Sequence, residues 1–161
     1  MCLRNRKLTG LLIAAAGLLV AAAPASAQLS SLQFGEYKIT GIHPNSFRSA
    51  DGSASIVCTN GGKTFTMSNI HGTVYKKGMA FVSGYASPVT VPAGKNTLDI
   101  NGSAYLCDGV SIWDLLACIV FRAEDYKIDV AMTITDASGK ARLYEKKGIN
   151  VAALLHNIRG R

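Results

Sequence analysis

Cysteine and histidine are scarce in this chain, and the short motifs that mark common enzyme classes are missing. Its 161 residues include four cysteines and three histidines, with no Cys-x-x-Cys pair and no histidine placed to form a zinc-ligand pair. The glycine patterns of dinucleotide sites and P-loops are absent. The nearest approach to a nucleophile elbow, Gly52-Ser53-Ala54-Ser55, has Ala54 where the serine would stand. The sequence therefore predicts no metal, no cofactor and no catalytic residue.

Basic residues are more numerous than acidic ones, but they are not gathered into a binding strip. Lys and Arg total 17 against 10 for Asp and Glu, and the densest stretches are 140–147 and the Arg159-Gly160-Arg161 tail. Proteins that bind single strands combine such density with aromatic side chains on which bases stack. No segment here does so, and a solvated face explains these charges better. The composition predicts no nucleic-acid partner.

The N-terminus has the three parts of an export signal. Positive side chains precede an uncharged run from Leu11 to Ala23, and Ala25-Ser26-Ala27 supplies small residues for cleavage before Gln28. The run is shorter than the roughly 20 residues of a spanning helix. Residues 1–27 are therefore predicted to be a cleaved signal peptide. The mature chain has 161 minus 27, or 134 residues, and is expected in the periplasm or outside the cell, without a stable membrane anchor.

Three cysteines follow the signal, at positions 58, 107 and 118. An odd number leaves at least one thiol free or paired between chains. Buried small apolar side chains, with one bridge at most, explain them better than a redox site. The pairing stays open, and Cys107 with Cys118 is favoured because the two flank one short segment.

The dominant pattern is a period of two, which is typical of half-buried strands. Apolar and polar residues alternate from Tyr126 to Ile134, the turn Asp136–Gly139 follows, and 141–145 is the expected partner strand. A second hairpin is predicted from 72–75 and 79–85 around Lys76-Lys77-Gly78. Further strands are expected at 35–42, 54–59, 63–70, 87–91 and 96–100.

One segment, 111–121, departs from this pattern. Apolar residues recur there at spacings of three and four through Ile112, Leu115, Leu116 and Ile119, which predicts an amphipathic helix. Many short strands and one helical insertion are typical of an antiparallel β-sandwich. We therefore expect one all-β sandwich domain over 28–161, with a short helical insertion near 111–121.

Residues 34–145 also share an order of short features with a known family. They are Ile56-Val57 leading to Asn60, then Phe65, Met67 and Ile70, then Gly72, Val74, Tyr75 and Gly78, then Val91-Pro92-Ala93-Gly94 before 97–100, and finally a helix-like gap before 126–134. This order resembles the water-stress-and-hypersensitive-response domain of atypical late-embryogenesis-abundant proteins. The family usually has Asn-Pro-Asn where this chain has Asn60-Gly61-Gly62. The resemblance implies an immunoglobulin-like or fibronectin-like sandwich with binding or protective roles and no catalytic residue.

Two functions are compatible with these observations. The first is an exported non-catalytic module that binds a partner, an envelope component or an apolar ligand, through loops at one end or through Trp113, Leu115 and Leu116 over the core. The second is a small periplasmic hydrolase or thiol-dependent enzyme that uses Cys118 or a histidine–carboxylate pair. The candidates for such a pair are His43, His71 and His156 with Asp108, Asp114, Glu124 and Asp125. The first function is favoured because the strands account for most apolar residues.

Overall fold

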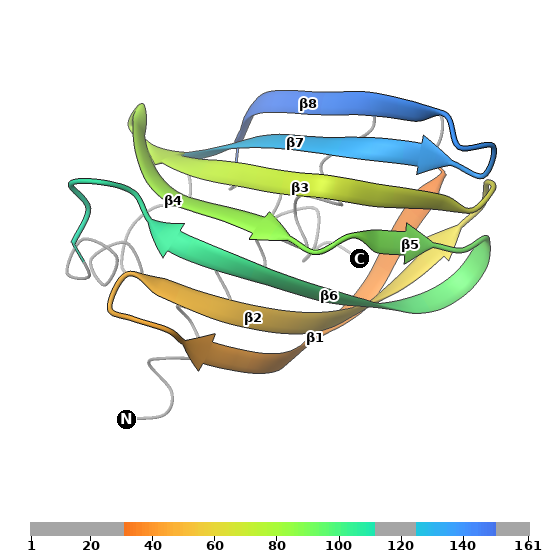
Figure 1. The fold of residues 1–161 in the computed structure, drawn as a ribbon, viewed down its shortest axis with the longest axis horizontal. Coiled ribbons are helices and arrows are strands. Elements are labelled where there is room, and N and C mark those ends of the chain that lie inside the picture. Colours follow the sequence, from red (N-terminus) through yellow and green to blue (C-terminus); the bar gives the residue numbers. More distant parts are fainter. Residues whose placement is uncertain (1–30, 112–124, 151–161) are drawn as a thin grey trace.

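The computed structural model describes residues 31–111 and 125–150, and these ranges form antiparallel β-structure (Figure 1). The strands are β1 (Leu32–Pro44), β2 (Ser49–Asn60), β3 (Phe65–Lys76), β4 (Met79–Ala86), β5 (Val89–Val91), β6 (Gly94–Leu106), β7 (Tyr126–Asp136) and β8 (Ala141–Asn150). Within these ranges no helix is long and apolar enough to cross a bilayer. The prediction of an all-β antiparallel fold is confirmed. The predicted signal peptide and residues 112–121 of the predicted helix lie outside the described residues.

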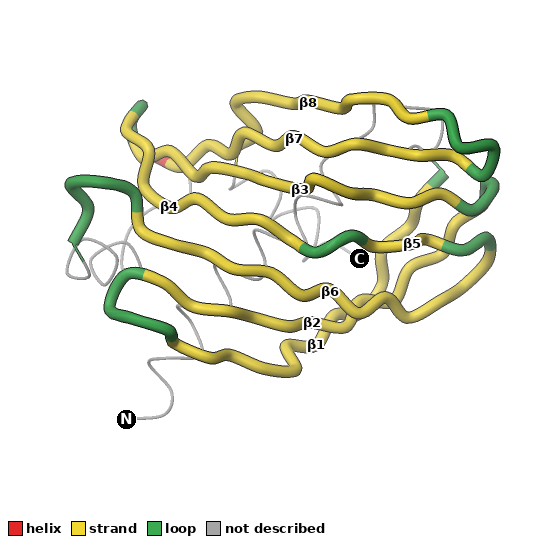
Figure 2. Tube along the Cα trace, viewed as in Figure 1, coloured by secondary structure: helices red, strands yellow, loops and turns green. Residues whose placement is uncertain are grey.

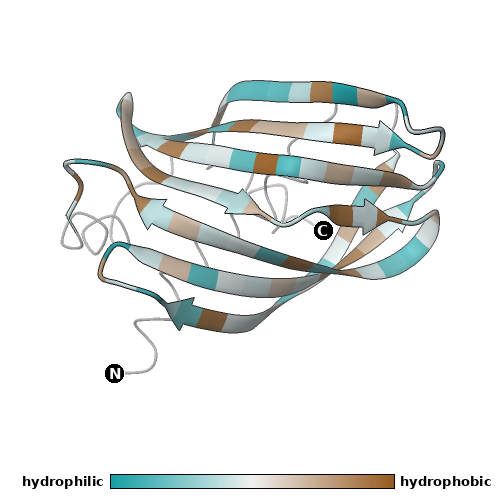
Figure 3. Ribbon diagram, viewed as in Figure 1, coloured by the Kyte–Doolittle hydropathy of each residue, from teal (hydrophilic) through white to brown (hydrophobic). Residues whose placement is uncertain are grey.

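The strands belong to one curled sheet. Their order is β1-β2-β6-β4-β3-β7-β8, and β5 pairs with β3 beside the end of β4 (Figures 1 and 2). Because the sheet curls, strands from its two halves bury their apolar residues in a single cluster, which joins Ile56 and Cys58 of β2 to Val130 and Met132 of β7. Apolar and polar residues alternate along the strands (Figure 3).

The alternation predicted from the sequence is clearest in β7. Ile128, Val130, Met132 and Ile134 are all buried, while Thr133 is half-buried on the other face. Side chains point to opposite faces at successive positions of a strand, so this register places one set in the core. The predicted strand at 126–134 is confirmed, and it extends to Asp136.

The predicted hairpins are also confirmed, with one difference in β3. Lys77 and Gly78 have φ of 49° and 84°, so both central residues of the β3–β4 turn take the positive φ that a tight two-residue hairpin requires. The two strands expected at 63–70 and 72–75 form the single strand β3. Its pairing with β7 shifts between Ser68 and His71, and Asn69, with φ of 50°, lies in this bulge.

Asn60, at the end of β2, has the one polar side chain that is buried among the described residues, with 2% of its surface exposed. Its Nδ2 donates to the carbonyl oxygens of Lys63 (3.0 Å) and Val91 (3.4 Å). Its Oδ1 accepts from the Gly62 amide (2.9 Å) and the Ser31 hydroxyl (3.3 Å). A buried amide with its donors and acceptor satisfied stabilises one arrangement of its neighbours. Asn60 therefore joins β2, the β2–β3 turn and β5.

Substitutions in β7 test the register. Val130→Asp should lower the free energy of unfolding by more than about 3 kcal/mol, because Val130 is only 4% exposed and the carboxylate would have no partner in the core. Thr133→Asp should cost less than about 1 kcal/mol, because Thr133 lies on the opposite face. Urea denaturation of both variants measures the difference, and equal losses would contradict the register.

Removing the Asn60 side chain tests its role as a link. Asn60→Ala should lower the free energy of unfolding by about 2–3 kcal/mol, since it leaves buried backbone groups without partners. Asn101→Ala is the matched control, because Asn101 is exposed on β6, and it should change stability by less than about 0.5 kcal/mol. Similar urea midpoints for the two variants would show that Asn60 is not a structural link.

Candidate functional site

Two segments of the same pattern lie side by side on the outer face of the sheet. They are Ser83-Gly84-Tyr85 of β4 and Ser103-Ala104-Tyr105 of β6, and the strands are antiparallel, so Ser83 pairs with Tyr105 and Tyr85 pairs with Ser103. The tyrosines are therefore diagonal neighbours, with Cα atoms roughly 7–8 Å apart. Tyr85 is 58% exposed and Tyr105 is 48% exposed. We call Tyr85 and Tyr105 the tyrosine pair; their exposed rings lie at the middle of the sheet.

Glycines on the opposite face allow the two strands to approach closely. A Cβ atom on Gly84 would lie 2.9 Å from the carbonyl oxygen of Ser103, and one on Gly102 would lie 2.7 Å from the carbonyl oxygen of Tyr85. Real Cβ atoms do not tolerate such contacts with backbone. The two glycines thus permit the pairing that brings Tyr85 beside Ser103.

Short polar side chains surround the tyrosine pair. The Thr73 and Ser83 hydroxyls are hydrogen-bonded at 2.9 Å, and the Thr40 hydroxyl donates to that of Ser53 at 2.9 Å. β2 and β4 contain no Lys, Arg or Glu, and β6 has Lys95 alone, near its start. Enriched tyrosine with depleted Lys and Glu is typical of interfaces, and tyrosine with serine, glycine and asparagine is typical of adaptable binding surfaces. We define the tyrosine face as Ser49, Asp51, Ser53, Ser83, Tyr85, Asp99, Asn101, Ser103 and Tyr105.

Asp51 lies on this face between β1 and β6. It pairs with His43 on one side and with Ser103 on the other, and the Ser103 hydroxyl donates to its Oδ1. This hydrogen bond, with a second from the Asn45 side chain and the nearby His43, lowers the pKa of Asp51 below its ordinary value of 3.8. The carboxylate is ionised at neutral pH and is held by its neighbours.

His43, Asp51 and Ser103 lie in one row across β1, β2 and β6, because each pairs with the next on the neighbouring strand. These are the three residue types of a hydrolytic triad, but their order in space is different. In a triad the imidazole lies between the serine and the carboxylate, so that it can take the hydroxyl proton. Here Asp51 lies between His43 and Ser103, and the serine hydroxyl donates to a carboxylate of low pKa. This arrangement supplies no base for Ser103.

Of the histidines named from the sequence, the two that the structure describes, His43 and His71, do not converge. The row from His43 to His71 passes through Asp51, Ser103 and Tyr85, which is four steps between strands, or roughly 19 Å. One metal ion cannot bind both histidines at that separation. Over 31–111 and 125–150, no group of three or more His, Cys, Asp or Glu residues could hold a metal. His156, Asp114 and Glu124 lie outside those ranges, Asp108 is exposed in a turn, and Asp125 is half-buried before β7.

Cys58 and Cys107 are described, and they do not form a disulfide with each other. Cys58 is buried, and desolvation raises the pKa of its thiol. Cys58 pairs with Asn96, whereas Cys107 follows Leu106, which is 106 minus 96, or ten residues, further along β6 and roughly 33 Å away. A disulfide between Cys58 and Cys107 is therefore excluded. Cys118 lies outside the described residues, so its pairing with Cys107 stays a prediction.

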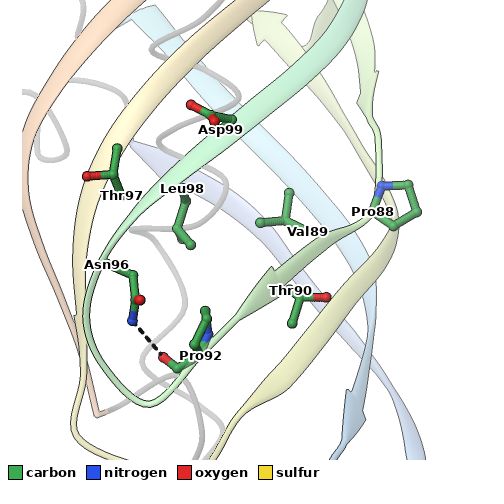
Figure 4. Close-up of a pocket in the computed structure, with 8 residues that line it drawn as sticks. All are labelled: Pro88, Val89, Thr90, Pro92, Asn96, Thr97, Leu98 and Asp99. Carbon is green, nitrogen blue, oxygen red and sulfur yellow. Dashed lines mark hydrogen bonds between the residues drawn. The ribbon is translucent and has the colours of Figure 1, made fainter.

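A shallow pocket of about 210 Å³ lies between β5 and β6 (Figure 4). It exists because β5 hydrogen-bonds to β3 and not to β6, so the two strands separate beyond the Ser87 amide, which donates to the Asn101 carbonyl at 2.8 Å. Its volume is below the roughly 300 Å³ of typical small-molecule sites. The pocket adjoins the tyrosine face through Asp99, whose carboxylate accepts from Ser55 at 2.6 Å. The lining residues are Pro88, Val89, Thr90, Pro92, Asn96, Thr97, Leu98 and Asp99.

The residues proposed from the sequence to contact a ligand, Trp113, Leu115 and Leu116, lie outside the described residues. Sequence reasoning missed the tyrosine pair. Its available signal was the repeated Ser-small-Tyr pattern at 83–85 and 103–105, which places serine and tyrosine on one face of each strand. The pairing of β4 with β6 brings the two copies together, and the sequence of neither segment predicts this pairing.

Comparisons with known proteins find distant structural similarity. No protein-family model matches the chain, and the search of curated proteins gives no match. A protein of known crystal structure from Archaeoglobus fulgidus is 21% identical, with a TM-score of 0.41, over 72% of this chain and 94% of that one. A FixG-related protein from Vibrio parahaemolyticus is 14% identical, with a TM-score of 0.28, over 74% and 96%. The yeast GGA1 GAE domain is 10% identical, with a TM-score of 0.31, over 76% and 93%.

The hydrogen bond between Ser103 and Asp51 can be tested by titration. Ser103→Ala should raise the pKa of Asp51 toward 3.8, because it removes the largest cause of the lowered value. A carboxyl with a lowered pKa stabilises the fold above the unfolded pKa and loses this effect as pH falls through the folded pKa. The variant should therefore lose less stability between neutral pH and pH 3 than the wild type.

Carboxyl-detected NMR titration of Asp51 provides the measurement. Ser53→Ala is the control, since the Ser53 hydroxyl bonds to Thr40 and not to Asp51. An unchanged pKa for Asp51 in the Ser103 variant would show that this hydrogen bond is not formed in solution.

Proposed function

We propose that this protein is an exported, non-catalytic β-module that binds a component of the cell envelope through its tyrosine face. The observation that supports this most is the tyrosine pair, two exposed rings at the middle of the sheet, on β4 and β6, where β2, β4 and β6 together have Lys95 as their one Lys, Arg or Glu. Binding sites use exposed aromatic side chains of this kind as rigid contact area. Export is supported by the signal peptide predicted at residues 1–27.

The finer fold belongs to the same proposal. An immunoglobulin-like or fibronectin-like arrangement is supported by the single core, to which β2 and β7 from the two halves of the curled sheet both contribute. Membership of the water-stress-and-hypersensitive-response family is supported by the order of the strands and by Asn60, where the resembling motif places its asparagine. Both remain part of what is proposed.

The alternative, a hydrolase or thiol-dependent enzyme, receives less support from the described residues. The carboxylate of Asp51 lies where a triad has its imidazole, and Cys58 is buried with a raised pKa, which opposes thiolate chemistry at that position. Binding explains the exposed tyrosines, and catalysis does not.

Retention on an envelope fraction tests the proposal. The mature chain should be retained by washed envelopes of the organism that encodes it, and the double substitution Tyr85→Ala with Tyr105→Ala should weaken retention at least tenfold. Leu143→Ala is the matched control, because Leu143 is 70% exposed on β8 and lies away from β4 and β6.

Urea midpoints establish that the variants are folded. Retention of the double variant at the level of the wild type, or equal loss in the Leu143 variant, would overturn the proposal.

A further inference from the structure

We infer that the ligand of the tyrosine face is a neutral glycan. This inference rests on the proposed function and adds the chemical class of the ligand. Three observations support it: the charge of the tyrosine face, the placement of the two rings, and the short hydrogen-bonding side chains around them.

The charges on the face disfavour an anionic ligand. Asp51 and Asp99 are its charged residues, and both carboxylates accept hydrogen bonds from serine hydroxyls, Ser103 and Ser55. The hydrogen bond from Ser103, which is the largest cause of the lowered pKa of Asp51, favours the ionised carboxylate. Lys38 lies on the same side of the sheet, but it pairs with Ser55 on the far side of β2 from the rings. A phosphate or sulfate group placed over the rings would therefore lie nearer to the carboxylates than to this lysine, and it would be repelled. A hydroxyl-rich neutral ligand meets acceptors instead.

The rings of Tyr85 and Tyr105 suit flat ligands with polarised C–H groups. The face of an aromatic ring carries partial negative charge, which attracts the C–H groups of a sugar ring. The tyrosines lie diagonally across β4 and β6, roughly 7–8 Å apart at Cα, so a ligand that spans them must be extended over the sheet. This spacing fits consecutive units of a glycan chain better than one small molecule.

The side chains between the rings are short and already restrained. Ser83 is hydrogen-bonded to Thr73, and its Oγ lies 3.4 Å from the Cys107 Sγ, so little rotamer freedom remains to be lost on binding. Serine and asparagine offer both donors and acceptors, which matches the dual character of sugar hydroxyls. Asn101 and Asp99 continue these groups along β6 toward the pocket of Figure 4.

A protein partner or a second copy fits the face less well. A stable protein interface buries about 800 Å² on each side with an apolar core, whereas Tyr85 and Tyr105 are the large hydrophobic side chains exposed on this face. A two-fold dimer on this face would gather both copies of its carboxylates in one interface, with no lysine or arginine among the residues that define the face to pair with them, which is unfavourable. We therefore propose the glycan, and the experiments below distinguish it from a protein partner and from a second copy of this chain.

A glycan array with the mature chain is the direct experiment. The probes are neutral glucans, mannans and N-acetylglucosamine oligomers, with polygalacturonate and heparin as anionic glycans. We expect binding to at least one neutral probe and to neither anionic one. Tyr85→Ala and Tyr105→Ala should each weaken it at least tenfold, and Tyr105→Phe, which keeps the ring, by less than about threefold. Leu143→Ala should bind as the wild type does.

Treatment of the envelopes separates failure of this inference from failure of the proposed function. Destruction of the glycan, by periodate where its sugars have vicinal diols and by a glycosidase matched to the bound array probe where they do not, should abolish tyrosine-dependent retention, and protease should leave it. The reverse result, or a tyrosine-dependent dimer in sedimentation, would overturn the glycan and establish a protein partner. Preferred binding to the anionic probes, or tyrosine-dependent retention without any array signal, would also overturn it. Retention that does not depend on the tyrosines would overturn the proposed function itself.

Discussion

The hydrogen bonds of the buried Asn60 join the end of β2 to the β2–β3 turn and to β5, and the arrangement of the sheet depends on this junction. Since β5 pairs with β3 and leaves β6, the β5–β6 turn needs another attachment, and Asn60 provides it through the carbonyl of Val91. The pairing of β2 with β6 runs without a bulge from Asn60 opposite Gly94 to Ser49 opposite Tyr105. Because register is inherited along a regular ladder, the same pairing that begins beside the Asn60 hydrogen bonds places Tyr105 opposite Ser49.

The other end of β6 is held by a different side chain. The Arg48 guanidinium donates to the carbonyl oxygens of Leu106 (3.3 Å), Cys107 (2.8 Å) and Val110 (3.1 Å), where the strand ends. The backbone of Arg48 also accepts from the Leu106 amide. With Asn60 at one end and Arg48 at the other, β6 is restrained along its length. The tyrosine face is thus built on a strand whose two ends are both held.

Local patterns predicted much of the fold, and non-local pairing accounts for what they missed. The alternation in 126–134 and the glycine after Lys77 determine β7 and the β3–β4 hairpin, because each depends on neighbours in sequence. The bulge at Asn69 was not predicted, since nothing in 63–75 shows that β7 will pair across it. The tyrosine pair was missed for the same reason: each Ser-small-Tyr segment is ordinary until β4 and β6 become neighbours. The residues that the sequence favoured for ligand contact, at 113–116, belong to the segment outside the described ranges.

The contacts that restrain the polar groups of the tyrosine face also decide what chemistry it can perform. The Ser103 hydroxyl donates to Asp51, whose pKa is lowered, so this carboxylate is a poor base for the serine proton. Because the Asp51 carboxylate holds the serine, it does not orient an imidazole that could act as the base. What remains available to a ligand is the exposed surface of the tyrosine rings, together with the remaining lone pairs of groups that are already held. Such a face can bind without rearrangement, and little ordering entropy opposes the ligand. These restrained, hydroxyl-rich groups are the features on which the proposed binding role rests.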